Sequence, residues 1–186
     1  MNSTNIKRMA GIALMSAIVV VLQLLGSFIR FGPVSISLVL VPIVVGAAMY
    51  GPSAGAVLGA VFSIVVLLQP DTLFFYGVNV FGTVATVLAK GICSGWIAGL
   101  VYKALSKKNT SFAVFLAAIV CPVVNTGLFA LGSKLFFWDA LAELGGGNAL
   151  LFLITGMIGF NFLAELGANM LCAPVILRIL HAVKKA

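Results

Sequence analysis

Four polar side chains stand inside long apolar runs, where a charge or an amide is costly. Lys90 lies in the run 82–105, Asn125 in 112–137, and both Asn161 and Glu165 in 149–180. Ionisable groups in membrane-spanning helices usually face the bundle interior and by default mark a substrate path. We therefore expect these side chains to bind a small polar solute.

Helical spacing adds further polar groups to the same faces. Thr86 lies four residues before Lys90, and Asn161 and Glu165 are four residues apart, so each pair shares one side of a helix. Asn79, in an aromatic interfacial segment, is another candidate binding residue. Trp138 either stacks on a ligand or anchors the chain at the membrane interface.

A purely structural interpretation stays open for the same residues. Lys90 and Glu165 can neutralise each other, and the asparagines can bridge helices at modest energy. The polar groups would then hold the bundle together without binding anything.

Motifs for covalent, metal or nucleotide chemistry are missing from the sequence. It has no HExxH, no GxSxG and no P-loop, and His181 lies alone near the C-terminus. Cys93, Cys121 and Cys172 have no paired spacing, so they predict neither a disulfide framework nor a metal site. We expect no catalytic residue, cofactor or metal, and active transport would need a gradient or a partner.

Composition places the chain in a membrane. With 62% hydrophobic and 8% charged residues, its 186 residues have more apolar surface than one soluble core can hide. The net charge of +7 is not arranged as a basic patch with interleaved aromatics, so we expect no nucleic-acid partner. The sequence predicts an all-α integral membrane protein in contact with the lipid bilayer.

The apolar runs predict six transmembrane helices in a single domain, residues 1–186. Their ranges are about 9–29, 34–49, 53–69, 82–105, 112–137 and 149–180, with a loop over 138–148. Pro42 and Pro122 predict kinks in the second and fifth helices. Eight basic residues lie at the ends on one side and only Arg30 and Lys134 on the other, which places both termini in the cytoplasm.

Small residues form stripes on two of the predicted helices. Gly51, Gly55 and Gly59 recur every fourth residue, so a neighbouring backbone can approach closely. On the first helix a smooth, shallow face is formed by Ala10, Ala13 and Ala17.

Four stretches resemble a known family. They are the alanines Ala13 and Ala17, the hairpin VPIVVGAAMYGPSAGAVLG over 41–59, AKGICSGWIAGLVYKAL over 89–105, and PVVNTGLFALG over 122–132. Together they resemble a substrate-binding (S) component of the energy-coupling factor (ECF) vitamin transporters.

The resemblance implies a six-helix bundle in the cell membrane of a bacterium. Such a bundle binds a water-soluble vitamin near its outer face, under the loops after the first, third and fifth helices. It also docks through the alanine face of the first helix onto a transmembrane coupling (T) subunit that carries two ATPase subunits. Family members commonly have a basic residue where Lys90 stands, and we favour pantothenate over riboflavin or folate.

Two other classes of function compete with this interpretation. One is an autonomous secondary transporter or channel in which Lys90 and Glu165 couple a small polar solute to protons. The other is a membrane scaffold or assembly factor. The first three and last three predicted helices share no repeated motif, which disfavours an inverted-repeat transporter.

Overall fold

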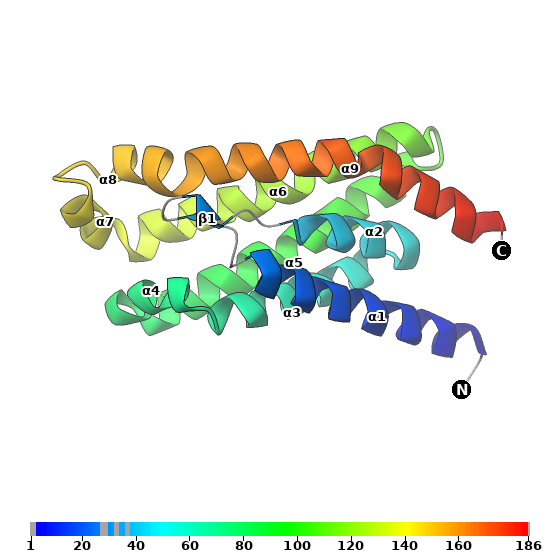
Figure 1. Cartoon of the computed structure of the whole chain (residues 1–186), viewed down its shortest axis with the longest axis horizontal. Helices are drawn as coiled ribbons and strands as arrows, with labels where there is room; N and C mark the ends of the chain where they lie inside the picture. Colours follow the sequence, from blue (N-terminus) through cyan, green and yellow to red (C-terminus); the bar gives the residue numbers. More distant parts are fainter. Residues whose placement is uncertain (1–2, 27–29, 32–33, 36–37, 186) are drawn as a thin grey trace.

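A computed structural model describes residues 3–26, 30–31, 34–35 and 38–185, which fold mainly into helices (Figure 1). The longer helices are α1 (Ser3–Gly26), α2 (Leu40–Tyr50), α3 (Pro52–Leu67), α5 (Val80–Leu105), α6 (Thr110–Phe136) and α9 (Gly159–Lys185). The shorter elements are β1 (Arg30–Phe31), β2 (Val34–Ser35), the 3-10 turn η1 (Pro70–Thr72), α4 (Leu73–Val78), α7 (Trp138–Leu144), α8 (Ala149–Leu151) and the π-helical turn η2 (Phe152–Ile158). Strands β1 and β2 pair antiparallel after α1.

Four helical segments within the described residues are long and apolar enough to cross a membrane. They are Asn5–Gly26, Val80–Leu105, Thr110–Phe136 and Ala149–Ala182. A fifth is obtained if Pro52–Leu67 and Pro70–Val78 count as one span, although they are bent by 77°. Helix α2, with 11 residues, is only about 16 Å long at the usual helical rise, so six full spans remain a prediction.

The second predicted helix is wrong in extent. It was expected over 34–49, but the helix begins at Leu40, and Val34–Ser35 belong to strand β2. Pro42 explains the start, because proline lacks the N–H that a helix interior needs but is tolerated in the first turn. Pro42 therefore lies at the beginning of α2 and not at a mid-helix kink.

Two other boundaries also differ from expectation. The predicted loop 138–148 contains α7, and the sixth predicted helix, 149–180, passes through the π-helical turn Phe152–Ile158 before continuing as α9. The first predicted helix, 9–29, corresponds to α1, and its last three predicted residues lie outside the described part of the chain.

The α2–α3 hairpin packs closely on α5, as its glycine stripe predicts. Gly51, between the two helices, has φ +94°, a conformation that glycine adopts without strain. A Cβ atom on Gly55 would overlap the carbonyl oxygen of Gly95, and one on Gly59 would overlap that of Gly91. The stripe on α3 therefore meets a matching glycine stripe on α5.

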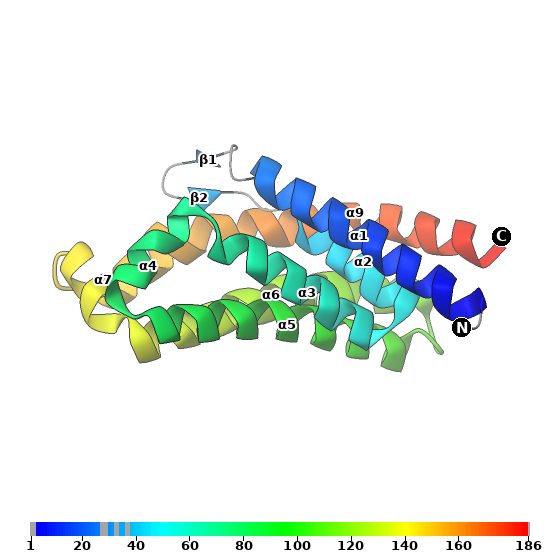
Figure 2. The ribbon, with the colours of Figure 1, turned by 90° about the horizontal axis from the view of Figure 1, so that it is seen from below.

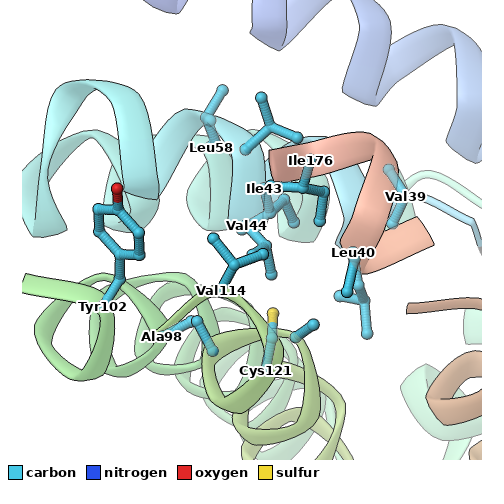
Figure 3. Close-up of a cluster of buried hydrophobic side chains, with 14 of the residues drawn as sticks. Val39, Leu40, Ile43, Val44, Leu58, Ala98, Tyr102, Val114, Cys121 and Ile176 are labelled. Carbon is cyan, nitrogen blue, oxygen red and sulfur yellow. The ribbon is translucent and has the colours of Figure 1, made fainter. Parts of the chain in front are cut away.

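An apolar core lies beside this contact. Leu40, Ile43 and Val44 of α2 are almost fully buried together with Leu58 of α3 and Ile176 of α9 (Figure 3). Short as it is, α2 is thus buried among the longer helices and anchors α3 and α9 in the bundle.

The two ends of the bundle differ. Both chain termini and the α5–α6 turn lie at one end, while α4 and α7 lie at the other (Figures 1 and 2). The connections that follow α3 and α6 thus share the end opposite the termini, and strands β1 and β2 lie on the same side of the bundle's middle. We call the two ends the termini end and the loop end.

Candidate functional site

A partly open cavity of about 150 Å³ lies among α3, α5, α6 and α9. Five of the seven predicted binding residues line its wall or the wall of its neighbour: Thr86, Lys90, Asn125, Asn161 and Glu165. The helices bring them together because each residue occupies the inward face of its own helix.

A second cavity, of about 320 Å³, adjoins the first. The two share Lys90, Asn125 and Asn161 as well as Asp71, Phe75 and Phe129. The second extends along the π-helical turn, where Phe152, Gly156 and Met157 line it. We treat the two cavities as one site with a polar chamber around Glu165 and a more apolar chamber beside η2.

Lys90 provides the positive charge of the site. Its ammonium nitrogen lies 5.1 Å from the centre of the Phe129 ring and 5.9 Å from that of Phe62. Ring faces attract a cation, most strongly away from water. The two phenylalanines therefore hold the charge at the cavity wall, where an anionic group on a ligand can reach it.

Glu165 provides a carboxylate in the polar chamber, with only 3% of its surface exposed. The amides of Asn125 and Asn161 lie next to it, and Lys90 interacts with it electrostatically. Within the described part of the chain, however, Lys90 and Glu165 form no direct ion pair, and Glu165 Oε2 is buried without a hydrogen-bond partner. The carboxylate is therefore only partly compensated by the protein.

Other buried polar atoms at the site are unpaired in the same way. Thr86 Oγ1, Asn125 Oδ1 and Asn161 Oδ1 have no partner. By contrast, the Thr83 hydroxyl donates to the Asn79 carbonyl at 2.7 Å and the Thr72 hydroxyl to the Val66 carbonyl at 2.6 Å. Because a buried unpaired polar group costs roughly 1–3 kcal/mol, the unpaired set indicates where a polar ligand or water would bind.

Two predicted binding residues do not reach the cavities. Asn79 is the N-cap of α5, where its side-chain oxygen accepts a hydrogen bond from the Gly82 N–H at 2.8 Å. Trp138 begins α7 and remains 36% exposed. The structure thus gives Asn79 a structural contact and leaves Trp138 at the surface.

Two glutamines at the site are not among the sequence candidates. Gln23 of α1 donates to the side-chain oxygen of Gln69 at 2.9 Å, and Gln69 donates to the Gln23 carbonyl at 3.2 Å. Both line the first cavity and are buried. Each lies near the end of an apolar run, where a glutamine is easily mistaken for an interfacial residue.

An aromatic wall closes the loop end of the site. Phe75 of α4 meets Phe129 and Phe137 edge to face, with ring centres 5.9 and 5.0 Å apart. The sequence marked 74–79 only as an aromatic segment, because nothing local shows that α4 folds back toward α6. The wall supplies apolar contact area for a ligand held by the polar groups.

The three alanines of α1 lie away from the cavities. Ala10, Ala13 and Ala17 are all exposed on the outer side of the helix. Their side chains leave a smooth strip that no described part of the chain covers.

The class of the protein follows from comparison with known families. The sequence model described as ECF transporter, substrate-specific component matches residues 7–177. The chain belongs to this family. No curated protein and no solved structure matches it.

As an ECF S component, the chain is a multi-pass membrane protein of a transporter family and not of an enzyme family. Membership implies a small-molecule substrate and interaction with T and ATPase subunits. The match includes all four stretches that carry the resemblance seen in the sequence, and it covers every residue that lines the two cavities.

Proposed function

We propose that this S component captures a water-soluble vitamin in the cavity around Lys90 and Glu165. The observation that carries the proposal is the group of unpaired polar atoms on three helices, Thr86, Asn125, Asn161 and Glu165, beside the half-buried cation of Lys90. A folded bundle without a ligand gains nothing from leaving these atoms unpaired. A polar ligand would satisfy them all.

The side chains of the cavity wall restrict which functional groups the ligand can carry. Lys90 suits a carboxylate, while Glu165 Oε2 suits a hydroxyl or N–H donor, and the asparagines suit an amide. Pantothenate, a small carboxylate with an amide and hydroxyls, offers all of these groups, and we favour it among the vitamins. Since lysine is a point charge, it would hold the carboxylate without the two-point geometry of arginine.

Transport follows from docking in this proposal. The exposed strip of Ala10, Ala13 and Ala17 contacts the T subunit, which carries two ATPases, because small side chains let a partner helix approach closely. The chain crosses the cell membrane six times with both termini inside, so the loop end and its cavity face outward. We place the whole chain in one transmembrane domain.

A transport assay tests this role. The chain alone in proteoliposomes should bind labelled pantothenate without accumulating it, because it has no phosphate-binding loop. Addition of the T subunit, the ATPases and ATP should produce concentrative uptake. Uptake by the chain alone, driven by a proton gradient, would refute the proposal and support a secondary transporter.

A further inference from the structure

A separate hollow lies at the termini end, far from the two cavities of the proposed vitamin site. It is a surface cleft of about 730 Å³, bounded by the start of α1, the turn between α2 and α3, and the end of α5. Three cations line it: Lys7 and Arg8 of α1, and Lys103 of α5. These helix ends are distant in the sequence, so the fold itself concentrates the charge.

No acidic side chain lines the cleft. The chain has four acidic residues, Asp71, Asp139, Glu143 and Glu165, and none of them lines the cleft. The helix dipoles do not set the sign of the electrostatic field at the cleft. The negative end of α2 and the positive end of α3 meet at the same turn, so their effects oppose each other. The side chains therefore give the cleft a positive charge that favours an anion.

One of the cations is held in place. Arg8 Nη2 donates a hydrogen bond to Ser53 Oγ at 2.8 Å, across the gap between α1 and α3. Because guanidinium has further donors in a fixed planar arrangement, this contact leaves other N–H groups that can donate to an anion. A phosphate group accepts such donors and also suits the point charges of Lys7 and Lys103.

The surroundings of the cleft are apolar. Ile6 and Met9, which flank the two α1 cations in sequence, are 50% and 60% exposed. Leu100, one turn before Lys103, is also exposed. Leu100 and Lys103 both line a smaller neighbouring hollow. A ligand that puts its charge in the cleft would thus have apolar surface beside it for hydrocarbon.

We propose that this cleft binds the phosphate headgroup of an anionic phospholipid from the leaflet at the termini end. Arg8, Lys7 and Lys103 contact the phosphate, and the acyl chains lie along the exposed apolar residues of α1 and α5. With both termini in the cytoplasm this is the cytoplasmic leaflet, whose anionic lipids attract such basic groups. The site is independent of the vitamin cavity.

The test titrates full-length protein in phosphatidylcholine vesicles with phosphatidylglycerol and counts bound lipid by native mass spectrometry. Arg8→Gln and Lys103→Gln should each weaken binding roughly tenfold or more, as expected for loss of a hydrogen bond to a charged group. The control is Lys108→Gln, at the same end but outside the cleft. It should weaken binding by no more than about fivefold, the value for one charge near an anionic surface.

Three outcomes would overturn the proposal. Equal losses for all three variants would mean a general surface attraction without a site. Displacement of phosphatidylglycerol by inorganic phosphate at equal concentration would mean a free-anion site. If Lys103→Gln left lipid binding intact but weakened assembly with the T subunit, the cleft would be a protein interface.

Discussion

Lys90 and Glu165 share one cavity without pairing directly, and this decides how the site is understood. A buried pair that existed only to neutralise itself would place the ammonium on the carboxylate. Instead, Lys90 lies over Phe62 and Phe129, and Glu165 Oε2 has no partner. This arrangement supports the proposal that the two charges serve groups that come from outside the chain.

Loss of the cation should therefore affect binding more than folding. Lys90→Met should cost on the order of 2–5 kcal/mol of ligand affinity, the range for removing one member of a buried charge pair. Isothermal titration calorimetry with pantothenate measures the affinity, and thermal unfolding in detergent measures stability. If Lys90 serves only Glu165, the single variant should instead lose stability, and Lys90→Met with Glu165→Gln should recover it.

At the residue scale, helical spacing was sufficient to identify most of the predicted residues that line the cavities. Thr86, Lys90 and Glu165 could be predicted because a polar group in a long apolar helix has few places to point. Asn79 was expected to bind the ligand but lies at the N-cap of α5, a position where asparagine is common. The contact between Gln23 and Gln69 joins residues 46 positions apart, and no local sequence pattern predicts it.

Among the helices, the contact between α3 and α5 governs the position of Lys90. Gly55 and Gly59 let the backbone of α3 lie against Gly91 and Gly95, which flank the turn of α5 that follows Lys90. The glycine stripe predicted this contact, because small residues at every fourth position let a neighbouring helix approach closely. The extent of α2 could not be predicted as easily, since an apolar run with a proline fits either a kinked helix or a short one.

One added methyl group should disturb this crossing. Gly55→Ala places a Cβ against the Gly95 carbonyl, which is backbone and cannot rotate away, so we expect a loss of about 1–3 kcal/mol, typical of overpacking. Gly127→Ala in α6 is the matched control, because its Cβ meets nothing within 4 Å. Thermal unfolding should show the first variant destabilised and the second unchanged or slightly stabilised. Equal melting temperatures for Gly55→Ala and the natural chain would contradict the packing.

Helix α1 offers a separate test of docking. Ala13→Trp should abolish uptake with the coupling module while ligand affinity in detergent stays the same, because the bulk lies on the exposed strip and not in the cavity. Leu163→Trp on α9, where the natural residue is 65% exposed, places the same tryptophan side chain elsewhere on the surface and should transport normally. Normal uptake by Ala13→Trp with an intact complex would exclude the alanine strip as the docking face.

For the whole molecule, the bundle separates its tasks between its ends. The cavity proposed to bind the vitamin is lined by Phe75 of α4 and Phe137 toward the loop end, and the basic cleft is lined by the start of α1 and the end of α5 at the termini end. The alanine strip of α1 runs along the outside. The proposed vitamin binding, docking and lipid contact thus use different surfaces, so each can be tested by variants that leave the others intact.

The most direct test of the central claim is the native mass of the protein purified from cells grown in vitamin-rich medium. The natural chain should carry the added mass of one small polar molecule, which fragmentation identifies. Lys90→Met should lose it, and Lys134→Met, at the loop-end tip of α6 and outside both cavities, should retain it. The same occupancy in Lys90→Met as in the natural chain would contradict the assignment of the cavity as the substrate site.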